Sequence, residues 1–448
     1  MTRRTQSCTR STWSTSRCTD FRLSRRLLRR ALAIVSGLSA LALLTLNLQL
    51  YSPESADYGP DQLGEDVVPQ LRFLGQALRR GAGERMQAVF PEGYLFTHVL
   101  YGLAWVEVGL RVPSESALHL QALEEANWAL ERLDTNADRA PFSRDLDPPH
   151  GLFYSGWSNW LRGGLLLLQP EQSRPLALVD RFQAETQALA LAFDRSPTPF
   201  LPAYPGQAWP VDSVVAIATL RLHDSLFPER FSMTIQRWLE EAQARLDPLT
   251  GLLPHRADSR TGEVLEGARG SSQSLVARFL VEVDPEWGRS QYGLFRRQFV
   301  APFLGAPGVR EYPESIAGQG DIDSGPLLAG FSPSATVVLI GAAQVQGDRE
   351  VADALIDASE AAGLPIRWAG GKRYLFGLLP VGDAFLVWAK TSRPWVATWS
   401  EATLPQVIEP GWRLPVHGLS LIVAAGLWPL TDRSLRGRIR GGNRHRPA

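Results

Sequence analysis

Two kinds of helical segment alternate through the middle of this chain, and this alternation constrains the fold more than any other feature. The first kind is amphipathic. Leu178, Phe182 and Leu189 recur at a period close to 3.6, while Asp180 lies elsewhere on the helical wheel. Segments of this kind are expected at 61–80, 115–133, 177–193, 228–246 and 349–362. A helix with one apolar face covers a core, so these segments are predicted to lie at the surface.

The second kind of segment is apolar on nearly all sides and opens with glycine, proline, aromatic and acidic residues. Six such segments start at Pro91, Gly151, Tyr204, Gly267, Gly318 and Lys372. A helix that is apolar all round is buried. The pairing of a surface helix with a buried helix recurs about every 50 to 60 residues, a spacing that indicates structural repeats. Repeats also explain how about 360 residues share one fold, which is more than a single core usually accommodates.

Six outer and six inner helices describe an all-α fold, an (α/α)6 toroid. This order of helices resembles the six-hairpin glycosidase-like superfamily, over about residues 58 to 392. The resemblance implies a parallel ring of inner helices with a funnel at one end. It rests on helix number and order, and no motif of a particular family is matched.

In such a toroid, the loops that precede the inner helices all reach the same end. These loops are rich in acidic and aromatic residues. The candidates for catalysis are Asp212, Asp321, Asp323, Glu314 and Glu92. The candidates for substrate binding are Tyr94, His98, His150, Tyr154, Trp157, Asn159, Tyr204, Trp209, His255 and Gln319. We expect these side chains to gather in one cleft.

Among these loops, the segment Gly318 to Pro326 (GQGDIDSGP) gives the most specific functional signal. Glycine permits unusual backbone angles, and proline suits the first turn of a helix, so Asp321 and Asp323 are expected on a tight loop just before a buried helix. They could provide one half of a catalytic carboxylate pair. Alternatively, Asp323 or Ser324 could cap the following helix. A calcium site is a further alternative, although the EF-hand spacing is absent.

Asp212 is the expected partner of that loop. It lies in the first turn of an apolar helix, beside Tyr204 and Trp209, whose rings could stack on a sugar. Alternatively, its charge could simply favour the helix dipole. Glu92 and Glu314 are reserves for the same role. Which carboxylate acts as acid and which as base stays open.

Several candidates have an equally ordinary structural interpretation. The run from Tyr154 to Trp160 could line a sugar subsite or cap and pack a helix. His98 lies on an apolar helix, where a histidine is usually a core residue. His150 and His255 lie in loops and are better candidates for ligand binding or proton transfer.

Other classes of chemistry find little support. H-x-x-x-H and H-E-x-x-H are absent, so no zinc site is expected, and we expect no metal and no cofactor. There is no phosphate-binding loop, no dinucleotide fingerprint and no G-x-S-x-G nucleophile elbow. Both cysteines, Cys8 and Cys18, lie near the N terminus, so the middle of the chain has neither disulfide nor thiolate nucleophile.

Two apolar stretches flanked by arginine bracket the toroid. Residues 31–51 are long enough to cross a membrane and follow a basic run, although a cleaved signal peptide is an alternative. Residues 414–430 are at the short limit and could instead be a buried helix. The expected organisation is a disordered basic cytoplasmic tail (1–30), an anchor (31–51), an extracytoplasmic toroid (52–413), a second transmembrane helix (414–430) and a basic cytoplasmic tail (431–448). The inner (plasma) membrane is the expected location.

Charge distribution agrees with this organisation. Residues 1–30 and 431–448 together carry +13, so the middle carries −13 in a chain of zero net charge. An acidic domain argues against nucleic acid and against anionic lipid as its partner. The expected partners are therefore a membrane, through the anchor, and a glycan or other small polar substrate.

These observations predict a membrane-anchored glycan-active enzyme that uses paired carboxylates, as glycoside hydrolases do. One alternative is a non-catalytic toroid that binds a glycan or a partner protein. Another is a lyase or isomerase on the same fold, with tyrosine and histidine as acid and base. Fold alone does not decide between them.

Overall fold

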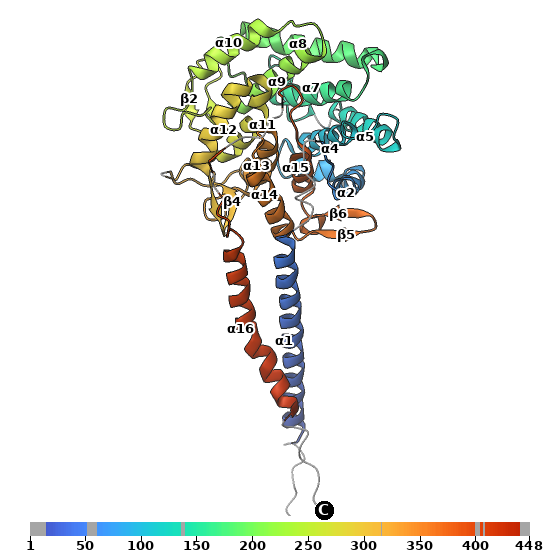
Figure 1. Ribbon diagram of the computed structural model, residues 1–448, viewed down its shortest axis with the longest axis vertical. Coiled ribbons are helices and arrows are strands. Elements are labelled where there is room, and N and C mark those ends of the chain that lie inside the picture. Colours follow the sequence, from blue (N-terminus) through green and yellow to red (C-terminus); the bar gives the residue numbers. More distant parts are fainter. Residues whose placement is uncertain are drawn as a thin grey trace, which may run out of the picture. The chain divides into compact units, whose positions relative to one another are not determined.

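The computed structural model describes residues 15–51, 61–135, 139–314, 316–398, 404–405 and 408–439, and only the backbone of 15–29 and 427–439. The chain divides into two compact units. One contains residues 1–49 and 413–448, and the other contains residues 50–412. Figure 1 shows that both are built mainly from helices.

The first unit is a pair of helices, α1 (Thr15–Gln49) and α16 (Leu414–Ile439), which pack against each other. Asn47 lies between them: its side-chain amide donates to Ser420 Oγ at 2.8 Å, and His417 Nδ1 contacts its Oδ1. Within the described residues, one stretch, Arg30–Gln49, is long and apolar enough to cross a membrane. A signal sequence near an N terminus has the same length and composition.

Two predictions for this unit need correction. Within the residues whose side chains the structure describes, the apolar part of α16 is Leu414–Gly426, which is shorter than a membrane-crossing helix, so the predicted span at 414–430 is not supported. Residues 15–30, predicted to be part of a disordered tail, are helical because leucine and arginine favour helix and extend the apolar helix backwards. Residues 1–14 and 440–448 of the predicted tails lie outside the described residues.

The second unit alternates outer and inner helices. The outer helices are α2 (Val67–Arg79), α5 (Ala117–Leu133), α8 (Leu176–Arg195), α10 (Ser232–Gln243), α12 (Pro285–Phe299) and α14 (Arg349–Ala362). The inner helices are α4 (Gly93–Gly109), α7 (Gly151–Leu167), α9 (Pro210–Leu226), α11 (Gly270–Val283), α13 (Pro333–Val345) and α15 (Pro380–Thr391). Short helices α3 (Ala82–Gln87), η2 (Glu171–Ser173) and η3 (Leu375–Gly377) complete the described set.

The inner helices form a closed ring. In the described part of the chain, α4 packs on α7, α7 on α9, α9 on α11, α11 on α13, α13 on α15, and α15 returns to α4. Each outer helix packs on an inner neighbour, and α2 packs on α15. The predicted (α/α)6 toroid is therefore confirmed by the contacts between its helices.

The fold is not purely helical. Three antiparallel hairpins occur in the described residues: β1 (Arg256–Ala257) with β2 (Val264–Glu266), β3 (Val300–Phe303) with β4 (Ala306–Val309), and β5 (Ile366–Trp368) with β6 (Gly371–Arg373). Each hairpin lies in a connection between an outer helix and the next inner helix. The prediction of an all-α chain misses them because they are too short to carry an alternating pattern.

Aromatic side chains fill the middle of the ring. Trp157 of α7 makes edge-to-face contacts with Phe96 of α4, Phe279 of α11 and Trp388 of α15, with ring centroids 5.2–5.9 Å apart. Trp157 is almost fully buried. Because these helices come from different sides of the ring, the contacts make the centre a packed core.

The segment after α15 covers the carboxyl ends of the inner helices. The carboxylate of Glu282, in the last turn of α11, accepts hydrogen bonds from the backbone N–H groups of Trp395, Val396 and Ala397. Trp395 also donates its indole N–H to Glu107, in the last full turn of α4, at 2.8 Å. Since α4 and α11 lie across the ring from each other, this segment spans its centre. The opposite end, where the inner helices begin, carries the candidate residues.

A buried charge cluster joins the first outer helix to the last two helices of the ring. Lys390 of α15 donates to Asp66, the residue before α2, at 2.9 Å and to Glu360 of α14 at 2.6 Å. Lys372 of β6 donates to the same carboxylates at 2.7 and 2.8 Å. The four side chains are at most 5% exposed, so each charge depends on its partners rather than on water.

Removal of one partner should therefore weaken the closure of the ring. Lys390→Met leaves two buried carboxylates with one ammonium group, and we expect a loss of about 3–5 kcal/mol in stability. Arg195→Met is the matched control, because Arg195 pairs with Asp147 at an exposed site and should cost at most about 1 kcal/mol. Thermal melting of the full chain measures both. Equal melting temperatures in the two variants would contradict this role of the cluster.

Candidate active site

Loops that are distant in sequence meet where the inner helices begin. The hydroxyl of Tyr204, in the loop before α9, donates to the carboxylate of Glu92, the N-cap residue of α4. His255, before α11, lies near Asp323, before α13. Asp212, in the first turn of α9, interacts electrostatically with both Asp323 and Glu92. The predicted convergence of these loops is thus present for four of the inner helices.

Asp212 is the most unusual group in this cluster. It is only 6% exposed. Among the described residues, none donates a hydrogen bond to its carboxyl group. Burial, and then the nearby charges of Asp323 and Glu92, raise the pKa of Asp212 well above its usual value. The dipole of α9 favours an ionised group at this position, but burial and two negative neighbours outweigh it. Asp212 therefore favours its protonated form more strongly than an exposed aspartate does.

Asp321 is held as an anion. Its Oδ1 accepts from the backbone N–H groups of Asp323 and Ser324 at 3.0 and 3.1 Å, and its Oδ2 accepts from Arg269 Nη1 at 2.5 Å. Partial burial opposes ionisation, but the hydrogen bond from Arg269 and the amide of Ser324 lower the pKa of Asp321 to about 2. Its side chain is 42% exposed, so it remains accessible to solvent.

These hydrogen bonds correct the expected capping role of the loop. Helix α13 begins at Pro333, and its cap is Ser332, whose hydroxyl accepts from the amide of Ala335. Pro326 is therefore not in the first turn of this helix, and neither Asp323 nor Ser324 caps it. Asp321 instead stabilises a turn within the loop. A hydroxyl six residues beyond Pro326 caps the helix just as well, and this is why the sequence placed the boundary too early.

Asp323 has the opposite character to Asp321. Its carboxylate lies 3.6 Å from His255 Nε2. Burial, and then the charges of Asp321 and Glu92, raise the pKa of Asp323 to about 7. Its side chain is 44% exposed, so water offsets part of this effect. The pKa values of Asp321 and Asp323, which are separated by one residue, are thus shifted in opposite directions. This pattern is typical of acid/base sites.

His255 lies beside Asp323 and carries an uncharged imidazole ring. It is nearly fully buried, and its Nδ1 lies 2.6 Å from the hydroxyl of Ser272. Burial, and then the charge of Arg269, lower the pKa of His255 to about 3. A neutral imidazole can exchange a hydrogen bond with a carboxyl group but adds no positive charge to the site.

Arg269, which is not among the residues predicted from the sequence, organises this end of the ring. It is 3% exposed and pairs with Glu311 at 2.7 Å, Asp321 at 2.5 Å and Glu266 at 3.1 Å. Its guanidinium lies 5.2 Å from the ring centroid of Tyr312. The available signal was its position at the N-cap of a buried helix, between Gly267 and Gly270, where a long charged side chain needs partners.

Glu311 is a second residue of this site that was not predicted from the sequence. Its carboxylate accepts from the amide and the hydroxyl of Ser271, at 3.1 and 2.7 Å, and so caps α11. It also accepts from Arg269. Burial raises the pKa of Glu311, although Ser271 and Arg269 oppose the shift. The acceptor that caps the start of α11 thus comes from a different loop, the one before α13.

Within the described residues, His255, Asp321 and Asp323 form a group whose ligand atoms lie within 4.8 Å of one another. Such a set could in principle bind a divalent cation. However, Arg269 Nη1 lies 3.4 Å from His255 Nε2 and already pairs with Asp321. Since a guanidinium group supplies the positive charge here, the arrangement favours an ion-paired site over a metal centre.

Five of the predicted substrate-binding residues belong to the core. Tyr94, His98, Tyr154, Trp157 and Asn159 are all buried. His98 Nδ1 lies 2.8 Å from the carbonyl oxygen of Tyr94, Tyr154 donates to the carbonyl of Leu133, and Asn159 donates to Thr186. Burial lowers the pKa of His98 to about 4. Their partners are structural, so we leave all five out of the candidate site.

The other predicted residues lie nearer the acidic cluster or at its edges. Trp209 contacts Tyr204 edge-to-face, with centroids 6.0 Å apart. His150 packs its ring on Tyr154. Gln319 is exposed, and its backbone carbonyl accepts from the hydroxyl of Tyr312. Tyr204 and Trp209 stay in the site, whereas His150 and Gln319 have no contact with its carboxylates among the described residues.

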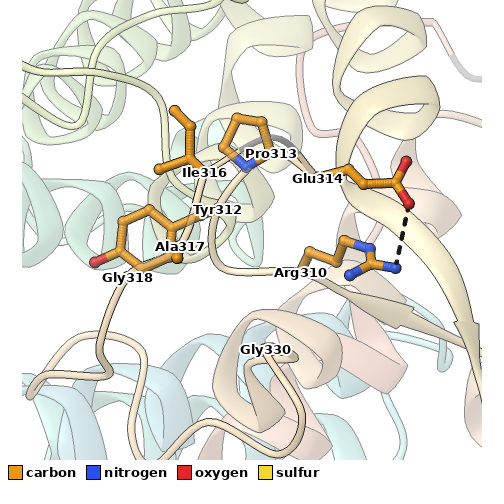
Figure 2. A pocket seen from close by; sticks show the side chains of 8 residues that line it. All are labelled: Arg310, Tyr312, Pro313, Glu314, Ile316, Ala317, Gly318 and Gly330. Atoms are coloured by element: carbon orange, nitrogen blue, oxygen red, sulfur yellow. Dashed lines mark ion pairs between the residues drawn. The ribbon is translucent and has the colours of Figure 1, made fainter.

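Glu314 lies in a different hollow. Figure 2 shows this pocket, lined by Arg310, Tyr312, Pro313, Glu314, Ile316, Ala317, Gly318 and Gly330. Glu314 is 88% exposed and lies 3.9 Å from Arg310. Tyr312 belongs both to this pocket and to the surroundings of Arg269. Glu314 is therefore next to the candidate site but is not one of its paired carboxylates.

No protein family and no curated protein matches the sequence. Among solved structures, a GH76 alpha-mannanase from Bacteroides thetaiotaomicron is similar at 9% identity and a TM-score of 0.44, over 66% of this chain and 84% of that chain. The assignment of the toroid rests on the helix contacts described above, because a match this distant carries no argument about function.

The buried neutral state of His255 has a measurable consequence. In the unfolded chain a histidine takes up a proton below about pH 6.5, whereas the folded state resists it down to about pH 3. This contribution to stability is complete above pH 6.5 and is lost as the pH falls toward 3. We expect His255→Gln to flatten the fall in stability between pH 7 and 4, by up to about 1.4 kcal/mol per pH unit.

Thermal melting across this pH range tests the expectation. His150→Gln is the control, since His150 is only partly buried, and this variant should keep the slope of the unmodified protein. Parallel curves for His255→Gln and the unmodified protein would show that His255 is not held neutral.

Proposed function

We propose that this protein is a glycan-active enzyme with a glycoside hydrolase-like acid/base mechanism, carried by the toroid and held at a membrane by α1. The observation that supports this most is Asp212: a buried carboxyl group without a hydrogen-bond donor in the described residues, which interacts electrostatically with two other carboxylates. An acid that holds its proton at neutral pH is what protonation of a glycosidic oxygen requires.

The chemistry follows from the different environments of the carboxylates. Asp212 donates its proton to the glycosidic oxygen as the bond from that oxygen to the anomeric carbon breaks. Asp323, with a pKa of about 7, takes a proton from the attacking water or attacks the anomeric carbon itself. Asp321 is tied to Arg269 and stays ionised. Its negative charge helps to keep the pKa of Asp323 high.

The aromatic residues fit a sugar substrate. Tyr204, Trp209 and Tyr312 are each partly exposed around the acidic cluster. Aromatic faces pack well on the apolar faces of sugars, while the carboxylates and Arg269 offer hydrogen bonds to hydroxyl groups. The retaining or inverting course depends on whether the two catalytic carboxyl groups are about 5 to 5.5 Å or about 6.5 to 9.5 Å apart.

The two alternatives fit less well. A lyase or isomerase that uses tyrosine as a base needs a lowered pKa, but burial and Glu92 raise the pKa of Tyr204. A non-catalytic glycan-binding toroid has no need for a buried protonated acid beside two anions, because like charges in a buried site cost stability. The carboxylates therefore favour catalysis over binding alone.

For the location, we propose that α1 anchors the chain and that the toroid is extracytoplasmic. Nine arginines precede residue 31, and basic flanks of an apolar span stay on the cytoplasmic side. The toroid has no cysteine and therefore no disulfide, so its stability does not depend on an oxidising environment.

Substitution of the proposed pair tests the function. We expect Asp212→Asn and Asp323→Asn each to lower turnover on a responsive glycan by roughly 100- to 10,000-fold, with unchanged melting temperature. Asp212→Asn should recover on aryl glycosides with good leaving groups, which need no proton, and Asp323→Asn should recover with azide if it is the nucleophile. A glycan panel followed by reducing-end assay and NMR of the product anomer measures these effects.

Glu314→Gln is the control, because this exposed carboxylate lies in the neighbouring pocket and should leave turnover unchanged. Full turnover in both aspartate variants would exclude the proposed pair. Binding of a glycan without turnover in the unmodified protein would support the non-catalytic alternative.

A further inference from the structure

One surface of the toroid is strongly apolar. It consists of the β5–β6 hairpin and the turn that follows, residues 363–379, here called the hairpin patch. Its large apolar side chains are 44% to 78% exposed: Leu364, Trp368, Leu375, Phe376, Leu378 and Leu379. So many large apolar groups in so short a stretch are unusual on a protein surface and mark an interaction site.

The hairpin patch is held in a fixed position. Figure 1 shows β5 and β6 extending from the helices of the toroid. The backbone N–H of Leu375 donates to the carbonyl of Gly363 at 2.7 Å, which continues the pairing of the two strands. Arg72 of α2 donates to the carbonyl of Gly370 at the hairpin turn, also at 2.7 Å. The exposed apolar groups therefore belong to ordered structure.

The backbone of the patch is strained where it exposes these groups. Leu364, Leu375 and Phe376 have φ values of 47°, 46° and 60°. Bulky residues rarely adopt this left-handed conformation, and such strain concentrates at functional positions. Ala369 also has a positive φ, but there the two-residue hairpin turn requires it. The chain thus tolerates unfavourable angles to keep apolar side chains exposed.

The charge of the patch differs from that of the domain around it. Residues 363–379 contain Arg367, Lys372 and Arg373 and no acidic residue, although residues 31–430 carry −13 overall. Lys372 serves the buried cluster, while Arg367 and Arg72 are exposed. Tryptophan, leucine and arginine together are the combination found where proteins enter the headgroup region of a bilayer.

From these observations we propose that the hairpin patch docks on a lipid bilayer with anionic headgroups and so fixes the toroid at the membrane surface. This inference rests on the proposed anchoring through α1. Residues 50–66 connect α1 to α2, and a chain of this length spans at most about 60 Å. A second copy of the chain is a poorer partner, because a symmetric contact would bring the same arginines together.

A spin label can report what covers the patch. The full chain with Cys8→Ser and Cys18→Ser receives a single label through Leu378→Cys and is placed, one copy per disc, in nanodiscs of phosphatidylcholine and phosphatidylglycerol. Met233→Cys on α10 is the matched control, since both parent side chains are 78% exposed. Power saturation of the label's electron paramagnetic resonance signal compares how often the label collides with molecular oxygen, which is apolar, and with a water-soluble nickel chelate.

We expect the ratio of oxygen to nickel collisions to be several-fold higher at position 378 than at 233, and to fall when phosphatidylglycerol is omitted. A chain that inserts while position 378 stays as open to nickel as position 233 overturns the docking alone. A chain that does not insert overturns the anchor and the docking together. Protection of position 378 only in discs with two copies identifies a second copy as the partner and also overturns the proposal. Glycan turnover is measured separately, so none of these outcomes depends on catalysis.

Discussion

The rest of the structure depends on closure of the ring, where α15 returns to α4, and a buried set of charges ties α15 to the start of α2 at this closure. Asp66, Glu360, Lys372 and Lys390 come from the first and last parts of the toroid and satisfy one another away from water. An apolar contact tolerates small shifts, but a buried ion pair loses its compensation when a partner moves. The cluster thus fixes where the last inner helix, α15, meets the start of the first outer helix, α2.

Closure of the ring brings together residues that are far apart in the sequence. Tyr204 donates a hydrogen bond to Glu92, and Arg269 forms an ion pair with Asp321. Asp212 interacts electrostatically with both Asp323 and Glu92. These residues come from four different loops. The charges that meet at this end of the ring give each of its carboxyl groups a different pKa, which no single loop could do alone. Arg269 holds Asp321 ionised, Asp321 raises the pKa of Asp323, and Asp323 helps to keep Asp212 protonated.

The sequence predicts the order of the helices well because periodicity is a local property, and 349–362 even matches α14 to the residue. It predicts less of the site. Asp212 and the loop of Asp321 are brought together as expected, but Trp157 and Tyr154 are core residues, since burial depends on neighbours from other helices. Arg269 was missed for the same reason: its importance lies in Glu311 and Asp321, which are 42 and 52 residues away.

Burial, and then the negative charges of Asp323 and Glu92 from separate repeats, favours the protonated form of Asp212. The most direct test is a pH-titrated infrared difference spectrum between the unmodified protein and Asp212→Asn. We expect a carboxylic-acid carbonyl band from Asp212 that persists above neutral pH and titrates at lower pH when Asp323→Asn is introduced. A carboxylate signal from Asp212 at neutral pH, unchanged by Asp323→Asn, would contradict it.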